Sequence, residues 1–417
     1  MSQWQELLPE ETLSQISEIR NQALQRFEKQ GFPNRKVEDW RYTPLSFIND
    51  WKFTPSQCTD FSEQRAGLVD AQFKLVFVDG IYKAELSSLD GIPEGVKLTD
   101  LSVASAAERL EVLSGTENAD LAHSLCLLNT ALTRHGAILH IEQGVKLEKP
   151  IEIIYWFSGQ QTDMSHVRNL VQLEQGASAI LVESFEGEGD QKQFSNVVTR
   201  VKLAEKAFLK QVRVQTTADN MHLITRTVVE QQAESEYRYH GLDAGGALVR
   251  HDLDVSLLGE KADVGLYGVY MLNGKQHLDN HSRVDHIAKD TSSKEVFKGV
   301  LGGKSRAVFN GKVVVHKGAD GTEAHQSNAN VLVSRLAEVD TKPELEIYAD
   351  EVVCSHGATV GQLDDDALFY MQARGIEADD AKRMLTVAFC REVLDFLDDE
   401  QLIGLQVPVL ESAIPED

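Results

Sequence analysis

One pattern recurs four times in the middle of the sequence, in VQLEQGASAILVES (171–184), VKLAEKAFLKQVRV (201–214), VVEQQAESEYRYHG (228–241) and VSLLGEKADVGLYG (255–268). Each copy is an apolar run, a polar turn with a small or charged residue, and a second apolar run. With Gly176, Lys206, Ala233 and Lys261 as equivalent turn positions, the spacings are 30, 27 and 28 residues (176 to 206, 206 to 233, 233 to 261). A period in this range predicts a solenoid, because one unit cannot bury its apolar face alone but stacked units can.

Short β-type runs extend the pattern in both directions, and no amphipathic helix of ordinary length interrupts them. They are 137–141, 151–157, 170–173, 179–183, 196–203, 208–215, 222–230, 248–257, 264–271, 307–315 and 330–334. Strands throughout favour a β-helix. A β-sandwich or jelly roll is the alternative, and it requires more hairpin dipeptides than Gly245-Gly246, Asn273-Gly274 and Asn310-Gly311.

The two ends of the chain differ from this centre. Apolar residues recur at helical spacing over 13–27, and Phe73–Val78 with the turn Asp79-Gly80 indicates a small β-hairpin. Near the C-terminus, 367–374 and 378–397 are expected to be helices, and the apolar face of the second could dock on the solenoid end or receive a partner. The sequence therefore predicts three parts: 1–135, helical with a small β element; 136–357, the β-helix; and 358–417, helical.

Charge and composition exclude several classes of function. The chain has 417 residues, with 41 Lys and Arg against 65 Asp and Glu, a net charge of −24. Such a charge repels nucleic-acid phosphates and anionic membrane surfaces, so neither is an expected partner. The four cysteines (Cys58, Cys126, Cys354, Cys390) are scattered with no CxxC pair, and the first residues lack a secretory pattern. A cytoplasmic protein is expected.

Three polar segments are candidate sites with structural alternatives. GVLGGKS (299–305) is one residue short of a phosphate loop, so a tight turn between strands is the better interpretation. His277, His281 and His286, with neighbouring aspartates, include good metal ligands, but on a strand His286 lies opposite the others, and an exposed polar turn is the preferred interpretation. The alternating amides of Gln326, Asn328 and Asn330 are expected to be structural, as in an amide ladder at a strand edge.

Cys354-Ser355-His356 is the segment with the most suggestive chemistry. A thiol and an imidazole two residues apart point to the same side of an extended chain, and both are ligands for iron and sulfur species. A Cys–His nucleophilic pair lacks an evident third group to orient the imidazole. On residue chemistry alone, a buried cysteine and a capping histidine remain the simpler interpretation.

At this segment the sequence resembles a known family. KPELEIYADEVVCSHGATVGQLDDDALFYMQARGI (342–376) is similar to the C-terminal signature of the SufB/SufD family, which builds iron–sulfur clusters. FKGVLGGKSRAVFNGKVVV (297–315), QSNANVLVS (326–334) and VEDWRYTPL (37–45) resemble the same family. The N-terminal CxxC typical of SufB is absent, and Gly357 stands where SufB tends to have Glu, so the chain resembles the SufD branch.

The resemblance implies a fold, a right-handed parallel β-helix between two helical regions, and it also implies a role. It implies a non-catalytic scaffold subunit of the SufBCD complex, with no tightly bound cofactor. The chain would pair with SufB through the β-helix end, and its C-terminal helices, about 377–397, would dock the ATPase SufC. His356 would hold a transient iron–sulfur cluster with SufB residues, and Cys354 is a weaker candidate.

Other possibilities remain open at this point. The resemblance does not decide whether a flavin binds the complex, or whether iron, sulfur or both pass through this subunit. An open β-helix end makes a homodimer of the isolated chain an expected state. A carbohydrate-active β-helix enzyme is the alternative from another class, and metal storage through the 277–286 cluster is a third.

Overall fold

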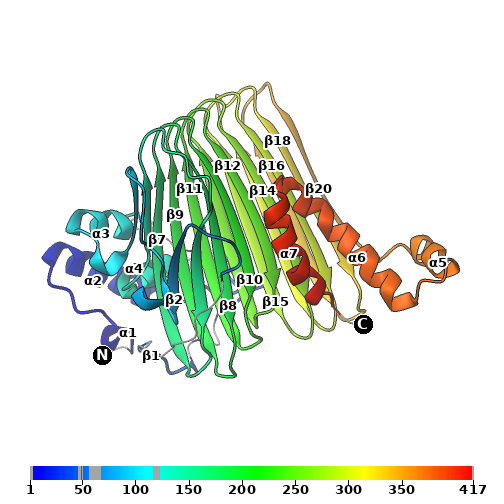
Figure 1. The fold of residues 1–417 in the computed structure, drawn as a ribbon, viewed down its shortest axis with the longest axis horizontal. Coiled ribbons are helices and arrows are strands. Elements are labelled where there is room, and N and C mark those ends of the chain that lie inside the picture. The colour runs from blue at the N-terminus through cyan, green and yellow to red at the C-terminus, as the bar shows by residue number, and fades with distance from the viewer. Residues whose placement is uncertain (1–2, 46–47, 49, 56–66, 116–122, 416–417) are drawn as a thin grey trace.

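The computed structural model describes residues 3–45, 48, 50–55, 67–115 and 123–415, and its centre is a parallel β-solenoid of about eight turns (Figure 1). Two ten-stranded sheets face each other. The first, sheet A, contains β4 (Val96–Asp100), β5 (Ala137–Ile141), β7 (Asp163–Leu173), β9 (Gln193–Leu203), β11 (Met221–Gln231), β13 (Leu248–Leu257), β15 (His277–His286), β17 (Arg306–Val315) and β19 (Glu338–Ile347), with β1 (Thr54–Pro55) beside β7. The second, sheet B, contains β3 (Ile81–Tyr82), β2 (Phe73–Val78), β6 (Ile151–Phe157), β8 (Ser178–Gly187), β10 (Phe208–Thr216), β12 (Glu236–Ala244), β14 (Asp263–Leu272), β16 (Ser292–Leu301), β18 (Glu323–Leu332) and β20 (Val353–Gly361).

From β5 onward the chain alternates between the two sheets, so each of these strands pairs in parallel with the strand one full turn away. β11, for example, pairs with β9 on one side and with β13 on the other. This pairing confirms the expected parallel β-helix. The sandwich and jelly-roll alternative is wrong, because those folds are built from antiparallel strands.

A column of left-handed turn residues sets the repeat. The residues with positive φ in this column are Gly144, Gly176, Lys206, Glu234, Lys261, Asp290 and Gly321, with φ between 55° and 78°. The amide of each donates to a carbonyl of the next turn, as Gly176 N–H does to Glu205. The third turn position is therefore Glu234 rather than Ala233, and the expected turn was one residue early.

In-register side chains fill the interior. Valines stack along one row of sheet A, at positions 171, 201, 229, 255, 284 and 313. All of them are buried. β-branched side chains suit such rows because they pack well against the same residue type on the neighbouring strand.

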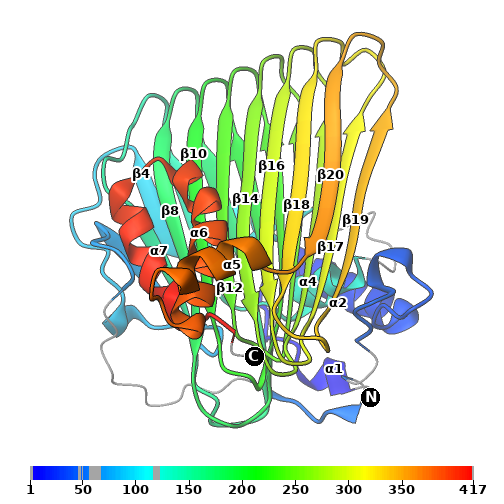
Figure 2. The ribbon, with the colours of Figure 1, turned by 90° about the vertical axis from the view of Figure 1, so that its right-hand side faces the viewer.

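The helices lie around the solenoid. They are α1 (Gln3–Glu6), α2 (Ser14–Gln30), α3 (Ala106–Leu113), α4 (Ser124–Leu132), α5 (Asp365–Ala373), α6 (Ala378–Leu394) and α7 (Glu400–Ser412). The N-terminal helices lie against sheet A, and α6 and α7 lie across sheet B (Figures 1 and 2). None of the helices within the described residues is long and apolar enough to cross a membrane.

The expected small β-hairpin is confirmed, because β2 pairs antiparallel with β3, and β2 also extends sheet B by pairing with β6. One expectation about the C-terminal region needs correction. Helix α6 does not dock on the solenoid end. It packs on the outer face of β14 and β16, where Cys390, Val393 and Leu394 are buried while Met384 stays exposed. The division into three domains stays a prediction.

Candidate functional site at the open end of the solenoid

The solenoid ends differently at its two ends. At the first end, the short strands β3 and β4 pair antiparallel with β2 and β5. At the other end, β19 and β20 each pair with one strand only and leave a free edge (Figure 2). We call the surface formed by β19 and β20 the open end.

Cys354 and His356 both lie on β20 and face the solenoid axis. Their in-register neighbours on β18 are Ala324 and Gln326, which are buried in the interior. Because no further turn covers β20, His356 is exposed, whereas Cys354 is half-buried against the apolar core. The prediction that the two side chains share one side is confirmed by this register.

Exposed apolar side chains lie on β19 and β20 or within two residues of these strands. Leu336, Ile347, Tyr348, Val353 and Val360 are between 43% and 62% exposed. A free strand edge with exposed apolar side chains is a template for pairing with another chain. The open end therefore has the properties of a protein interface.

A buried polar layer lies directly beneath His356. The Gln326 amide donates from Nε2 to Glu295 Oε2 at 2.6 Å, and the Ser282 hydroxyl donates to Glu295 Oε1. Burial raises the pKa of Glu295.

The three amides of β18 face the interior and not a strand edge. Their structural role is as expected, since Asn330 donates to Asn328 at 2.7 Å. Sequence reasoning missed Glu295. The only sequence feature that indicates it is its place among the alternate residues of β16 that point into the solenoid.

The cysteines differ in accessibility. Burial raises the pKa of Cys126 and raises that of Cys390 to about 12, while Cys58 lies outside the described residues. Partial burial also raises the pKa of Cys354, so its thiol form predominates at neutral pH. Since the thiolate is the metal-binding form, Cys354 is a poorer ligand than a neutral imidazole.

The histidine cluster at 277–286 lies on β15 and is mostly buried, so an exposed polar turn was the wrong interpretation. His286 points into the solenoid and bonds Thr291 and Ser293 at 2.8 and 2.9 Å. His277 points outward to Thr43 at 2.8 Å. Burial lowers the pKa of both histidines. Within the described residues, no three His, Cys, Asp or Glu side chains form a group that could hold a metal ion.

The glycine-rich segment 299–305 has a structural role. Residues 302–305 form the turn between β16 and β17, with Gly303 at φ 58°, as expected for a tight turn.

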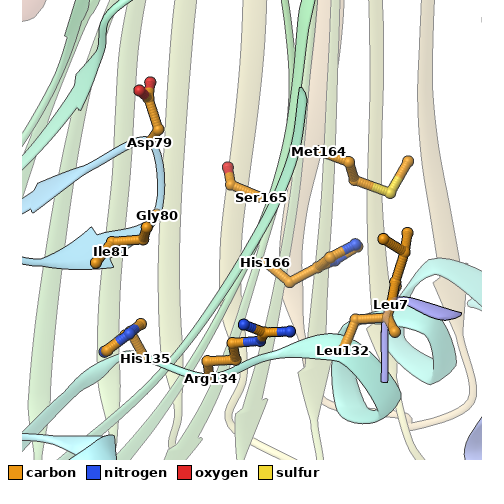
Figure 3. Close-up of a pocket in the computed structure, with 10 residues that line it drawn as sticks. All are labelled: Leu7, Asp79, Gly80, Ile81, Leu132, Arg134, His135, Met164, Ser165 and His166. Carbon is orange, nitrogen blue, oxygen red and sulfur yellow. The ribbon is translucent and has the colours of Figure 1, made fainter. Parts of the chain in front are cut away.

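A cavity of about 50 Å³ lies far from the open end, between α4, β7 and the β2–β3 turn (Figure 3). His166 and Met164 line it, and its size suits a few water molecules.

The fold and the open end define a class of protein: a parallel β-solenoid with helices on its sides and unpaired strand edges at one end. Comparison with known families is specific. Residues 155–389 match the family described as "SUF system FeS cluster assembly, SufBD core domain", and residues 1–153 match "SufBD protein N-terminal region". The chain belongs to the SufBD family of iron–sulfur cluster assembly proteins.

Individual relatives agree with this assignment. The chain is 30% identical to iron–sulfur cluster assembly protein SufD of Escherichia coli, over 98% of this chain and 95% of the relative. It is 30% identical to a SufBD family protein of Synechocystis, over 89% and 85% of the two chains. It is 31% identical to protein ABCI7, chloroplastic, of Arabidopsis thaliana, over 93% and 84%. These matches support a SufD-type assembly protein and offer no support for a carbohydrate-active enzyme.

Proposed function

We propose that this chain is a non-catalytic scaffold subunit that pairs with SufB through the open end and holds an iron–sulfur cluster there during assembly. The observation that carries the proposal is the position of His356, exposed on the last strand at a free, apolar sheet edge. The cluster is cargo in this proposal, and no cofactor is tightly bound. The proposed location is the cytoplasm.

The site is proposed to be shared because this chain supplies too few ligands by itself. At the open end it offers the imidazole of His356 and, less favourably, the thiol of Cys354. Neutral imidazole binds iron without losing a proton. The remaining ligands would be thiolates or carboxylates of SufB, so a cluster could form only while the two solenoid ends are in contact.

SufC is proposed to dock on the C-terminal helices. Helix α5 projects away from the solenoid (Figure 1), and its Phe369 and Tyr370 are 72% and 57% exposed. Exposed aromatic residues are common anchors of protein interfaces. Helix α6 links α5 to sheet B, where Lys298 bonds the Phe389 carbonyl at 3.0 Å. Movement of a bound ATPase could therefore be transmitted to the solenoid.

Replacing His356 with Ala tests the proposal. We expect loss of iron–sulfur enzyme activity in cells that depend on this assembly system, while the variant still co-purifies with SufB and SufC. His325→Ala is the matched control, because His325 is an exposed histidine on the neighbouring strand that faces outward and bonds Ser355. Iron and acid-labile sulfide in the purified complex provide the direct measurement.

Normal cluster content in the His356→Ala complex would refute the role of this histidine. Failure of the wild-type chain to co-purify with SufB would refute the pairing. Both measurements come from the same purification, so the two parts of the proposal are tested separately.

A further inference from the structure

The amide oxygen of Gln326 is a buried acceptor without a partner. Gln326 is only 4% exposed, and its Oε1 atom has no hydrogen bond to any described residue. A buried carbonyl without a hydrogen bond is unfavourable, because the group has lost its water partners and gained none. Such an atom in a well-packed interior requires an explanation, and the position of Gln326 directly beneath the open end supplies one.

The orientation of this amide is fixed by the turn below it. Gln326 Nε2 donates to Glu295 at 2.6 Å, and Glu295 also accepts from Ser282. The Glu295 carboxylate or carboxyl group cannot bind Oε1 in the same way without turning the amide over and losing this bond. The nitrogen is therefore directed toward the preceding turn, and the oxygen is the atom of this amide that no described residue binds.

A glycine makes room for this arrangement. A Cβ atom built on Gly311 would lie 2.1 Å from Gln326 Nε2. Gly311 does not need its conformational freedom, because its φ is not among the positive values. Its small size is what lets the amide extend across the solenoid toward Ser282, which is the neighbour of Gly311 in the sheet register.

Of the two in-register side chains in the layer above, that of His356 can donate to this oxygen and that of Pro343 cannot. His356 is the in-register neighbour of Gln326 on β20, and Pro343 is the in-register neighbour of Gly311 on β19. Side chains in register on adjacent strands lie about 5 Å apart. Proline has no N–H and no polar side chain, whereas the imidazole of His356 has a ring N–H and makes no hydrogen bond to a described residue.

We propose that Gln326 is a positioning residue for His356: its Oε1 accepts the N–H of one ring nitrogen, which directs the other ring nitrogen to the cluster. This inference rests on the proposed role of His356. Histidines that bind metals usually donate their second ring N–H to a fixed acceptor, which sets the tautomer and the orientation of the ring. Glu295, Ser282 and Gly311 would hold that acceptor in place.

The test uses the full chain and a readout that does not depend on cluster assembly. Nitrogen-15 NMR of labelled histidines reports the tautomer of His356, assigned by loss of its signals in His356→Ala. We expect one tautomer in the wild type and a mixture in Gln326→Leu. Asn328→Leu is the matched control, because Asn328 is an inward amide on the same strand whose neighbour on β20 is Ala358.

The second readout is iron retained by the complex with SufB and SufC after anaerobic addition of Fe²⁺ and sulfide. Removal of an outer partner of a metal ligand commonly lowers metal affinity about 10- to 100-fold, and a loss of this order is expected for Gln326→Leu. Gly311→Ala displaces the amide without removing it, so it should shift the tautomer in the same direction if Gln326→Leu does not fold.

The outcomes separate this inference from the proposed function. An unchanged tautomer in both Gln326→Leu and Gly311→Ala would overturn the inference, even if His356→Ala abolishes cluster assembly. An altered tautomer combined with normal assembly in His356→Ala would keep the hydrogen bond and refute the proposed function. If a SufB residue, and not His356, donates to Gln326 Oε1, then Gln326→Leu would alter the tautomer of His356 only in the complex with SufB. That result would also overturn the inference.

Discussion

Single polar residues inside the solenoid are stabilised by neighbours on adjacent turns. Arg213 forms an ion pair with Asp243 one turn away, and both are buried. Glu183 accepts from Gln211 and from the Tyr155 hydroxyl, and burial raises the pKa of Glu183. Buried charges and amides are tolerated where such partners exist, because an unpaired charge would be far more costly.

His166 is an exception, because neither ring nitrogen has a hydrogen-bond partner among the described residues. Its side chain lies in the cavity of Figure 3, and burial lowers its pKa from 6.5 to about 3. The folded protein therefore keeps this imidazole neutral, while the unfolded chain takes up a proton below about pH 6.5. Since the unfolded state then binds more protons, the free energy of unfolding must fall as the pH falls.

The variant His166→Leu removes this proton-linked loss. Between pH 7.5 and 5.5, the free energy of unfolding of the wild type should fall by about 1.4 kcal/mol more than that of the variant. The lower pH lies one unit below the histidine pKa of the unfolded chain, and each pH unit below that pKa costs the folded state this amount. Urea unfolding at the two pH values is the measurement. Parallel changes in the two proteins would show that His166 can be protonated in the folded state.

At the scale of elements, sequence periodicity identified the strands whose inward residues are apolar. Strands β5, β6 and β13 have the predicted bounds. Strands β15, β16 and β19 were missed, because their inward positions include Asn280, Ser282, Glu295 and Thr341, and their outward positions include charged side chains. Polar residues on both faces remove the alternation on which strand prediction depends.

The candidate site was predictable only in part. The spacing of Cys354 and His356 indicated a shared side, and family resemblance selected His356. The layer beneath them could not be deduced, because the contacts of Gln326 with Glu295 and Gly311 depend on residues 31 and 15 positions away that only the solenoid register brings together. Helix α7 was not predicted either. It contains Pro408, and a proline inside a segment usually argues against a helix there.

Gly176 belongs to the column of left-handed turn residues, and it allows a test of backbone strain that is free of any steric clash. A Cβ atom on Gly176 would meet nothing within 4 Å, while the φ of Gly176 is 68°. Gly176→Ala should therefore lower the free energy of unfolding by about 1–2 kcal/mol through the left-handed backbone alone. Gly176→Asn is the control and should cost less, since Asn tolerates this conformation. Equal losses in urea unfolding would contradict this account.

At the scale of the whole molecule, the two ends of the solenoid predict how the isolated chain associates. Short antiparallel strands close the first end, and helices cover the sides, so the open end carries the free edges of both sheets. An interface that uses the same surface on both copies closes after two chains. The isolated chain should therefore form dimers through β19 and β20, and not filaments.

The net charge of −24 opposes this self-association. Two copies repel each other, and salt screens the repulsion, with a Debye length of about 8 Å at 0.15 M and about 3 Å at 1 M. Dimers should therefore become more stable as the salt concentration rises from 50 to 500 mM. Sedimentation velocity of the isolated chain over a range of concentrations measures this change.

Two lysine substitutions locate the dimer interface. Val360→Lys places a cation on the apolar surface of the open end, where Val360 is 48% exposed, and should leave the chain monomeric at both salt concentrations. Val103→Lys is the control, because Val103 is 73% exposed and lies outside the open end, between β4 and α3. It adds the same charge and should still dimerise. Dimers that persist in Val360→Lys, or that weaken with added salt, would place self-association on another surface and leave the open end unoccupied until its proposed partner binds.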